Sequence, residues 1–163
     1  MFKTIAWATD GSSSARDALA VATRLAHDNA AKMVIVHVDE LPVGRAVIAP
    51  NPNGAASAAL HRAAQDLHAQ GIEATVMSSS VASGDVARGI VNLAQKAGAD
   101  VIIAGNRRHG PLARLLLGDV ASRLLQIAPC PVLVVPSRRK ADTPSDSAGT
   151  TASSAVSQTG SPT

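Results

Sequence analysis

Short apolar runs alternate with alanine-rich stretches along the first 136 residues, and this alternation constrains the fold more than any other feature. The runs at residues 101–104 and 132–135 are apolar at every position, which is typical of strands buried on both faces of a sheet. The stretches between the runs repeat apolar residues every three or four positions, as a helix packed along one face does. Since strands separated by helices pair in parallel through right-handed crossovers, the pattern predicts a parallel sheet covered by helices.

Five strands and four helices are expected in this part of the chain. The strands are predicted at about residues 4–9, 33–38, 74–79, 100–104 and 131–135. The helices are predicted to begin at the serines 12–14, near residue 55, after Gly84 and Asp85, and near Asp119. Residues 39–53 are predicted to be a loop because prolines and glycines interrupt them. The fold class is therefore α/β, a doubly wound five-stranded parallel sheet with four helices.

The last segment of the chain, residues 137–163, differs from the rest. Serine, threonine, glycine, proline and alanine dominate it, and its few apolar residues follow no helical or strand period. Such a composition buries too little apolar surface to offset the entropy of an ordered chain. We therefore expect one domain over residues 1–136 and a disordered tail over residues 137–163.

Composition excludes several classes of function. A net charge of +3, with only Phe2 and Trp7 as aromatics, does not make the basic, base-stacking surface of a nucleic-acid binder. One cysteine, Cys130, makes neither a disulfide framework nor a metal cage, so we interpret it as a small apolar side chain and Trp7 as core filling. No run approaches the ~20 apolar residues of a membrane span, and the apolar run at 5–8 is too short for a signal peptide. The expected location is the cytoplasm, with no membrane or nucleic-acid partner.

Polar residues and glycines follow the first and fourth predicted strands, at the edge where open parallel sheets bind ligands. Thr9, Asp10 and Gly11 follow the first strand, and the segment 105–110 follows the fourth and leads on to Gly118. Glycines at 105, 110 and 118 permit positive φ and a close approach to a ligand, and the amides that open a helix at Asp119 attract phosphate. Two alternatives stay open: the glycines only turn the chain, and Asp10 only caps the turn.

Common nucleotide and catalytic motifs do not fit this segment. Gly105 and Gly110 have the glycine spacing of a Walker A loop, but Pro111 and Leu112 stand where Lys and Ser/Thr are needed. The dinucleotide fingerprint is absent as well. No nucleophile and base are paired, so no catalytic or metal-binding residue is assigned, and His37 is interpreted as a hydrogen-bonded core residue.

The ordered motifs of the chain resemble those of the universal stress protein family. They are Thr9-Asp10-Gly11-Ser12, His37-Val38, Ala99 to Gly105, Leu115-Leu116-Leu117-Gly118 and Pro129 to Pro136. The resemblance covers about residues 2–136. It implies a homodimer that pairs through the last strand, Val132–Val135, and a role in the stress response.

Nucleotide-binding members of that family carry the loop G-x2-G-x9-G-[ST], and this chain departs from it twice. Gly105 and Gly118 match, but Arg108 replaces the middle glycine and Asp119 replaces the hydroxyl residue. The resemblance implies ATP or another adenine nucleotide as ligand. The Asp119 carboxylate, a departure from the family loop, is one group that can hold Mg²⁺ against the phosphates. The residues it implies for the site are Ala8, Thr9, Asp10, Val38, Gly105, Arg107, Arg108, His109, Gly110, Gly118, Asp119 and Val120.

Three functions remain as hypotheses. The first is a regulatory homodimer that senses an adenine nucleotide through the loop 105–120. The second, suggested by Arg108 and Asp119, is a dimer that binds no nucleotide and acts through protein partners. The third is a slow ATPase, for which only Asp119 and His109 are available as a base.

Overall fold

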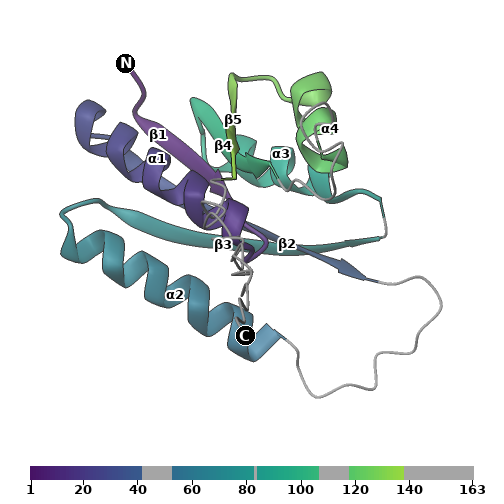
Figure 1. The fold of residues 1–163 in the computed structure, drawn as a ribbon, viewed down its shortest axis with the longest axis horizontal. Helices are drawn as coiled ribbons and strands as arrows, with labels where there is room; N and C mark the ends of the chain where they lie inside the picture. The colour runs from purple at the N-terminus through teal and green to yellow at the C-terminus, as the bar shows by residue number, and fades with distance from the viewer. Residues whose placement is uncertain (42–52, 83, 107–117, 138–163) are drawn as a thin grey trace, which may run out of the picture.

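The structure, a computed structural model, describes residues 1–41, 53–82, 84–106 and 118–137. Within these residues strands and helices alternate in the order β1 (Thr4–Ala8), α1 (Ser13–Asn29), β2 (Lys32–Leu41), α2 (Asn53–Ala69), β3 (Ala74–Ala82), α3 (Val86–Lys96), β4 (Val101–Asn106), α4 (Asp119–Ile127) and β5 (Val132–Pro136) (Figure 1). The predicted tail, apart from Ser137, lies outside the described residues. No helix among the described residues is long and apolar enough to cross a bilayer.

The strands form one parallel sheet in the order β3-β2-β1-β4-β5. This confirms the predicted fold class, a five-stranded doubly wound sheet with four helices. The central strand β1 pairs with two neighbours, so that Trp7 lies beside Ile35 on one side and Ile103 on the other. The chain builds outward from β1 in one direction through β2 and β3 and in the other through β4 and β5. The strand order therefore reverses between β1 and β4, where a crevice forms in folds of this kind.

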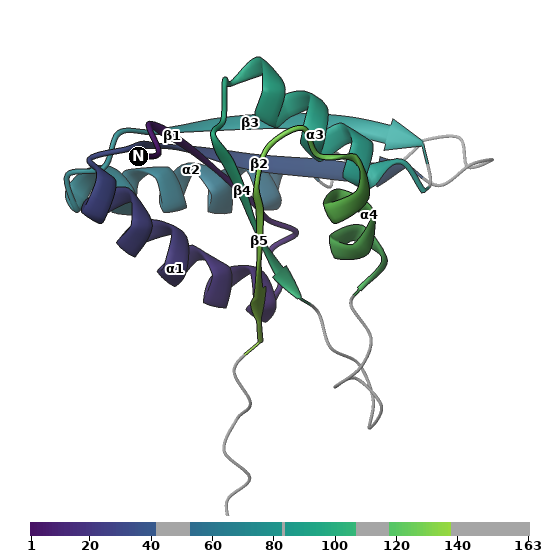
Figure 2. The same cartoon turned by 90° about the horizontal axis from the view of Figure 1, so that it is seen from above.

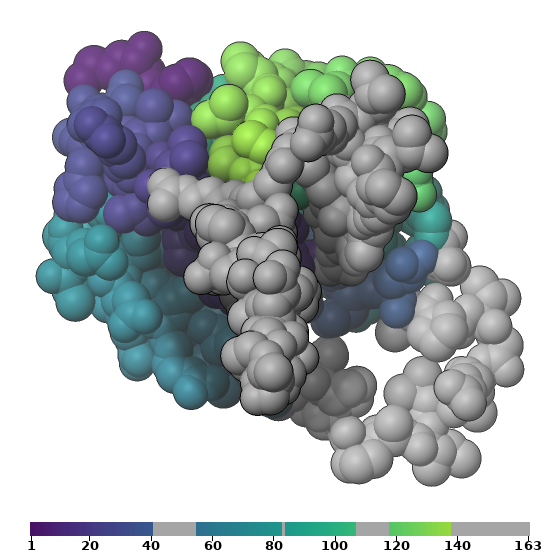
Figure 3. All heavy atoms as spheres, viewed as in Figure 1, coloured from purple at the N-terminus to yellow at the C-terminus, as the bar shows by residue number. Residues whose placement is uncertain are grey.

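Helices cover both faces of the sheet, α1 and α2 on one face and α3 and α4 on the other (Figure 2). Figure 3 shows α1 and α2 side by side at the surface on their face. Trp7 is 4% exposed beneath α1 and donates from its indole Nε1 to the Ala15 carbonyl at 2.9 Å, which confirms it as core filling. The buried face of α1 is built from small side chains (Ser14, Ala15, Ala18, Ala22 and Ala26). These let the helix approach the sheet closely, so a dense core needs few aromatics.

The other face holds the second core, where Ala6, Val36 and Ile102 pack against α3 and against Leu124 of α4. Cys130 is half-buried at the edge of this core. Its partial burial raises the pKa of its thiol above the ordinary value. The interpretation of Cys130 as a small apolar side chain is therefore confirmed.

The strand β2 is longer than predicted, and so is its neighbour β3. Residues 39–41 were expected in a loop, but Asp39 pairs with Ser80 and Glu40 with Val81 in the parallel ladder. The prediction for this segment is wrong because charged residues at the end of a strand look like loop in a sequence. In the sheet their backbones continue the hydrogen bonds beyond the last residue of β1. Two acidic side chains are thereby carried to the carboxyl edge of the sheet.

The opposite, amino edge of the sheet is held by Asp100. Its carboxylate accepts hydrogen bonds from the amides of Lys3 at 2.6 Å and Thr4 at 2.8 Å. These backbone donors stabilise the charged form, so the pKa of Asp100 lies below its ordinary value. Asp100 thus fixes the start of β1 against the start of β4. A ligand site is expected at the opposite, carboxyl edge of the sheet.

Candidate functional site

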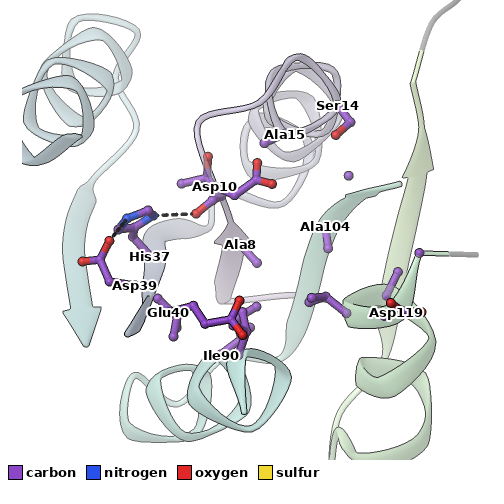
Figure 4. Close-up of a pocket in the computed structure, with 17 residues that line it drawn as sticks. Ala8, Asp10, Ser14, Ala15, His37, Asp39, Glu40, Ile90, Ala104 and Asp119 are labelled. Atoms are coloured by element: carbon purple, nitrogen blue, oxygen red, sulfur yellow. Dashed lines mark hydrogen bonds and ion pairs between the residues drawn. The ribbon is translucent and has the colours of Figure 1, made fainter. Parts of the chain in front are cut away.

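A cavity of ≈ 650 Å³ lies at the carboxyl ends of β1, β2 and β4, between the starts of α1 and α4 (Figure 4). This volume is typical of a site for a nucleotide-sized molecule. Eight of the residues predicted from the sequence line it: Ala8, Thr9, Asp10, Val38, Gly105, Gly118, Asp119 and Val120. The other four, Arg107, Arg108, His109 and Gly110, lie outside the described residues. The fold therefore gathers around one cavity every predicted site residue that it describes.

The turn between β1 and α1 forms one wall. The Asp10 carboxylate accepts a hydrogen bond from the amide of Ser12 at 2.9 Å, so the alternative in which Asp10 caps this turn is confirmed. Gly11 has φ +76°, a conformation that suits glycine. The Ser12 hydroxyl then accepts from the amide of Ala15 at 3.3 Å and caps α1. Ser14 and Ala15 of the first helical turn consequently face the cavity.

Gly105 forms the floor of the cavity through close packing and not through a special dihedral angle. The expectation of positive φ at Gly105 and Gly118 is wrong, since neither is among the positive-φ glycines and Gly118 has φ −61°. A Cβ atom on Gly105 would instead collide with the backbone carbonyl of Ser14 and lie 2.8 Å from the amide nitrogen of Ala15. The glycine is needed because β4 runs directly against the start of α1.

The start of α4 forms the opposite wall. Gly118 is its N-cap, and its amide donates to Oδ1 of Asn106, which is 5% exposed, at 3.1 Å. The Asn106 side chain thus ties the end of β4 to the start of α4 across the loop between them. Asp119 occupies the first helical turn and is exposed. The first amides of a helix have no partner within it, and of these the Gly118 amide already has an acceptor.

The end of β2 supplies residues that sequence reasoning did not assign to the site. His37 is 13% exposed, with Nδ1 2.8 Å from the Thr9 carbonyl oxygen and Nε2 3.1 Å from Asp39 Oδ1. It is hydrogen-bonded as predicted, but it belongs to the cavity wall. Glu40 also lines the cavity and accepts a hydrogen bond from the Gly84 amide at 2.8 Å. Asp39 and Glu40 were both missed because β2 continues past Val38 through pairing with β3, which the sequence pattern does not show.

The remaining lining residues are mostly small or apolar, and they come from three helices and β4. Ser14, Ala15, Val86, Ile90, Ala104 and Ala121 complete the wall. Val86 and Ile90 belong to α3, which no motif connected with the site. Their helical spacing only predicted that they face the sheet, and it is the end of the α3 face that reaches the cavity.

The polar part of the cavity is acidic. Four carboxylates line it, from Asp10, Asp39, Glu40 and Asp119 (Figure 4). Within the described part of the chain, no three His, Cys, Asp or Glu side chains are close enough together to hold a metal ion. The acidic groups are therefore spread around the walls, where they offer hydrogen-bond acceptors to a ligand.

The fold and the cavity define a class: a parallel α/β protein with a ligand-sized pocket at the point where the strand order reverses. The sequence model of the universal stress protein family matches residues 1–136. The chain is 36% identical over 138 residues to a Thermus aquaticus universal stress protein from the QAH/OAS sulfhydrylase 3′ region, covering 83% of this chain and 99% of the relative. This chain belongs to the universal stress protein family.

Solved structures agree with this assignment. A protein of the same family from Burkholderia pseudomallei superposes with a TM-score of 0.63 at 29% identity, covering 82% of this chain and 96% of the other. The structure of a universal stress protein in complex with cAMP superposes with a TM-score of 0.62 at 23% identity, covering 84% of this chain and 99% of the other. The fold is thus shared with a protein that binds a cyclic adenine nucleotide.

Proposed function

We propose that this chain is a regulatory protein of the stress response that binds an adenine nucleotide in the cavity at the carboxyl edge of the sheet. The observation that carries the proposal is the cavity itself, which has the volume of a nucleotide site and is lined by eight of the residues expected to bind one. The cAMP complex of a protein with the same fold supports it.

The lining divides into parts that suit the parts of a nucleotide. Val38, Val86 and Ile90 present apolar surface for the adenine ring. In this proposal Asp10 and Asp39 would accept hydrogen bonds from the ribose hydroxyls. The phosphate would lie at the start of α4, where the helix dipole favours an anion. Each part of the nucleotide would then meet a different part of the cavity lining.

The Asp119 carboxylate would weaken phosphate binding at the start of α4. A carboxylate in the first helical turn is itself stabilised by about 0.3–1 kcal/mol through the dipole, so it competes with a phosphate for the same positive end. Its repulsion of a phosphate ~4 Å away is on the order of 1–4 kcal/mol, depending on the local dielectric. We therefore expect weaker binding of ATP than a serine in this place would allow, with a bridging Mg²⁺ as one compensation.

Calorimetric titration of the full chain with ATP, ADP, AMP and cAMP, with and without Mg²⁺, tests the proposal. We expect saturable binding and a tenfold or larger gain in ATP affinity for Asp119→Ser, because about 1.4 kcal/mol of repulsion is removed. Asp66→Ser is the control, since it removes an equal charge from the exposed surface of α2. No heat and no shift in melting temperature with any nucleotide at millimolar concentration would refute the proposal.

A second candidate function is a dimer that acts through protein partners without a nucleotide. It is favoured by the bond between Asn106 and the Gly118 amide, which occupies a donor that a phosphate would use. It predicts no binding by the parent chain and newly created ATP binding in the double variant Arg108→Gly with Asp119→Ser. Tight binding by the parent chain contradicts it.

We propose further that the protein is a homodimer that pairs through β5. Among the residues that the structure describes, β4 is the only strand that pairs with β5. Leu133 on it is 40% exposed, and its valines are only half-buried. An edge strand of this kind offers free backbone groups and apolar side chains to a second copy.

A further inference from the structure

Glu40 lies on the same face of the sheet as the apolar wall of the cavity. Side chains alternate between the two faces along a strand, so Val38 and Glu40 of β2 point to one face and Asp39 points to the other. Val38 packs against the core beneath α3, and its methyl groups would lie 2.9 and 3.2 Å from a Cβ atom on Gly89 of that helix. Glu40 is therefore the next residue of β2 towards the carboxyl edge whose side chain points to the α3 face.

Two contacts fix Glu40 at the start of α3. Its backbone pairs with Val81 of β3, and Val81 Cγ1 would lie 3.0 Å from a Cβ atom on the same glycine of α3. Its carboxylate accepts a hydrogen bond at 2.8 Å from the amide of Gly84, two residues before α3 begins. Figure 4 shows the Glu40 and Ile90 side chains pointing into the cavity from β2 and α3. The carboxylate is thereby held beside the apolar surface of Val86 and Ile90.

A carboxylate beside an apolar wall distinguishes bases by the groups on their edges. An ionised carboxylate only accepts hydrogen bonds, and its two oxygens offer about four lone-pair sites. The bond from the Gly84 amide uses one of these sites and orients the group, which can accept from a ligand as well. Adenine carries an amino group on carbon 6 and donates there. Hypoxanthine carries an oxygen at this position, which would face the carboxylate without a shared proton.

We propose that Glu40 selects adenine by accepting a hydrogen bond from the 6-amino group of a base seated against Val38, Val86 and Ile90. This inference rests on the proposed function and names the side chain that recognises the base at the same site. Nucleotides that differ only at carbon 6 carry the same phosphate. The selection therefore does not depend on charges elsewhere in the cavity.

The test compares AMP with purine riboside 5′-monophosphate, which has a hydrogen in place of the 6-amino group, by calorimetric titration of the full chain at neutral pH. We expect AMP to bind about three- to tenfold more tightly, the effect of one hydrogen bond to a carboxylate at the mouth of a cavity. AMP binding that is no tighter overturns the inference and leaves the proposed function standing. Absence of binding by both nucleotides overturns the two together.

Glu40→Gln assigns the preference to this side chain. The amide oxygen of the glutamine can keep the bond from Gly84, so that its NH₂ group, a donor, is turned to the base. We expect the preference for AMP over purine riboside 5′-monophosphate to disappear. IMP, with its oxygen at carbon 6, should gain at least threefold in affinity relative to AMP. An unchanged ratio of affinities in Glu40→Gln would show that another group recognises the base.

Two controls separate the position of the charge from the charge itself. Asp39→Asn removes an equal charge from the same cavity but from the other face of β2, and it should change the affinities for AMP and purine riboside 5′-monophosphate by the same factor. Glu73→Gln, exposed just before β3, should leave both affinities as they are. If Asp39→Asn abolishes the preference and Glu40→Gln keeps it, the inference is wrong.

A further readout does not depend on the folding of a variant. AMP labelled with ¹⁵N in its 6-amino group reports the hydrogen bond directly by NMR. We expect the amino protons to move downfield when AMP binds to the parent chain, because a charge-assisted hydrogen bond deshields them. Amino protons that keep their free-ligand position in the saturated complex contradict the inference.

Discussion

Gly105 is the residue where the packing of the fold and the shape of the cavity depend on each other. In Gly105→Ala the new Cβ would overlap the backbone of Ser14 and Ala15, which cannot move without shifting the start of α1. We expect a loss of about 1–3 kcal/mol in the free energy of unfolding, the usual cost of overpacking. Denaturant unfolding of the variant measures it, and ligand binding should weaken as well because both neighbouring residues line the cavity.

Gly89→Ala is the matched control. Its Cβ would also be crowded, but by side-chain methyl groups of Val38 and Val81 at 2.9–3.2 Å. Side chains yield more easily than backbone, and alanine gains up to about 1 kcal/mol over glycine within a helix. The control should therefore lose less stability than Gly105→Ala. Equal losses would mean that contact with the α1 backbone is not the cause.

At the scale of elements, α1 is the helix whose start forms both a cap and a wall of the cavity. Ser12→Ala removes the hydroxyl that accepts from the Ala15 amide, and we expect a loss of about 1 kcal/mol in stability. This corresponds to a melting temperature lower by about 2–5 °C for a domain of this size. Ser13→Ala, at an exposed neighbouring position, is the control. A loss that is the same in both variants would show that the cap is not responsible.

The strands were predictable from the sequence wherever burial requires their side chains to be apolar. The strands β1 and β4 are mainly apolar and buried, and buried strands can be little else, so their places and the parallel topology followed. The apolar run of β5 also predicted a strand, but the expectation that it is buried on both faces is wrong, because β5 lies at the edge of the sheet and none of its residues is buried. The end of β2 was not predictable in the same way. Asp39 and Glu40 are kept in the strand by backbone pairing with Ser80 and Val81, a long-range contact that leaves no periodic pattern in either segment.

The candidate site was predictable to a similar extent and for a related reason. Thr9, Asp10 and Gly118 follow from the rule that ligands bind where the strand order reverses, and they do line the cavity. Gly105 was predicted to matter because glycine permits positive φ, which is the wrong cause. The true cause is the close contact of β4 with the start of α1, and local sequence does not show such a contact. His37 was not assigned to the site because the sequence does not show whether a histidine in a strand lies in the core or lines a cavity at the end of the strand.

For the whole molecule, helices contact both edge strands of the sheet, α2 and α3 on β3 and α1 and α4 on β5, but the two strands differ in polarity and exposure. The edge strand β3 is packed by α2 and α3, and four of its nine residues are polar, Thr75 and the serines 78–80. The edge strand β5 is short, has only apolar side chains, and carries the exposed Leu133. Since an exposed apolar edge tends to pair with another chain, β5 is the edge at which we expect association.

Leu133→Glu tests this expectation. In the proposed dimer the new carboxylate would face its own copy across a two-fold axis, and burying two like charges without partners costs several kcal/mol. Light scattering after size exclusion at micromolar concentration should give twice the 16.5 kDa chain mass for the parent and the monomer mass for the variant. Ala59→Glu, exposed on α2 near the opposite edge, should remain dimeric. A monomeric parent, or a dimer unaffected by Leu133→Glu and broken by Ala59→Glu, would contradict association through β5.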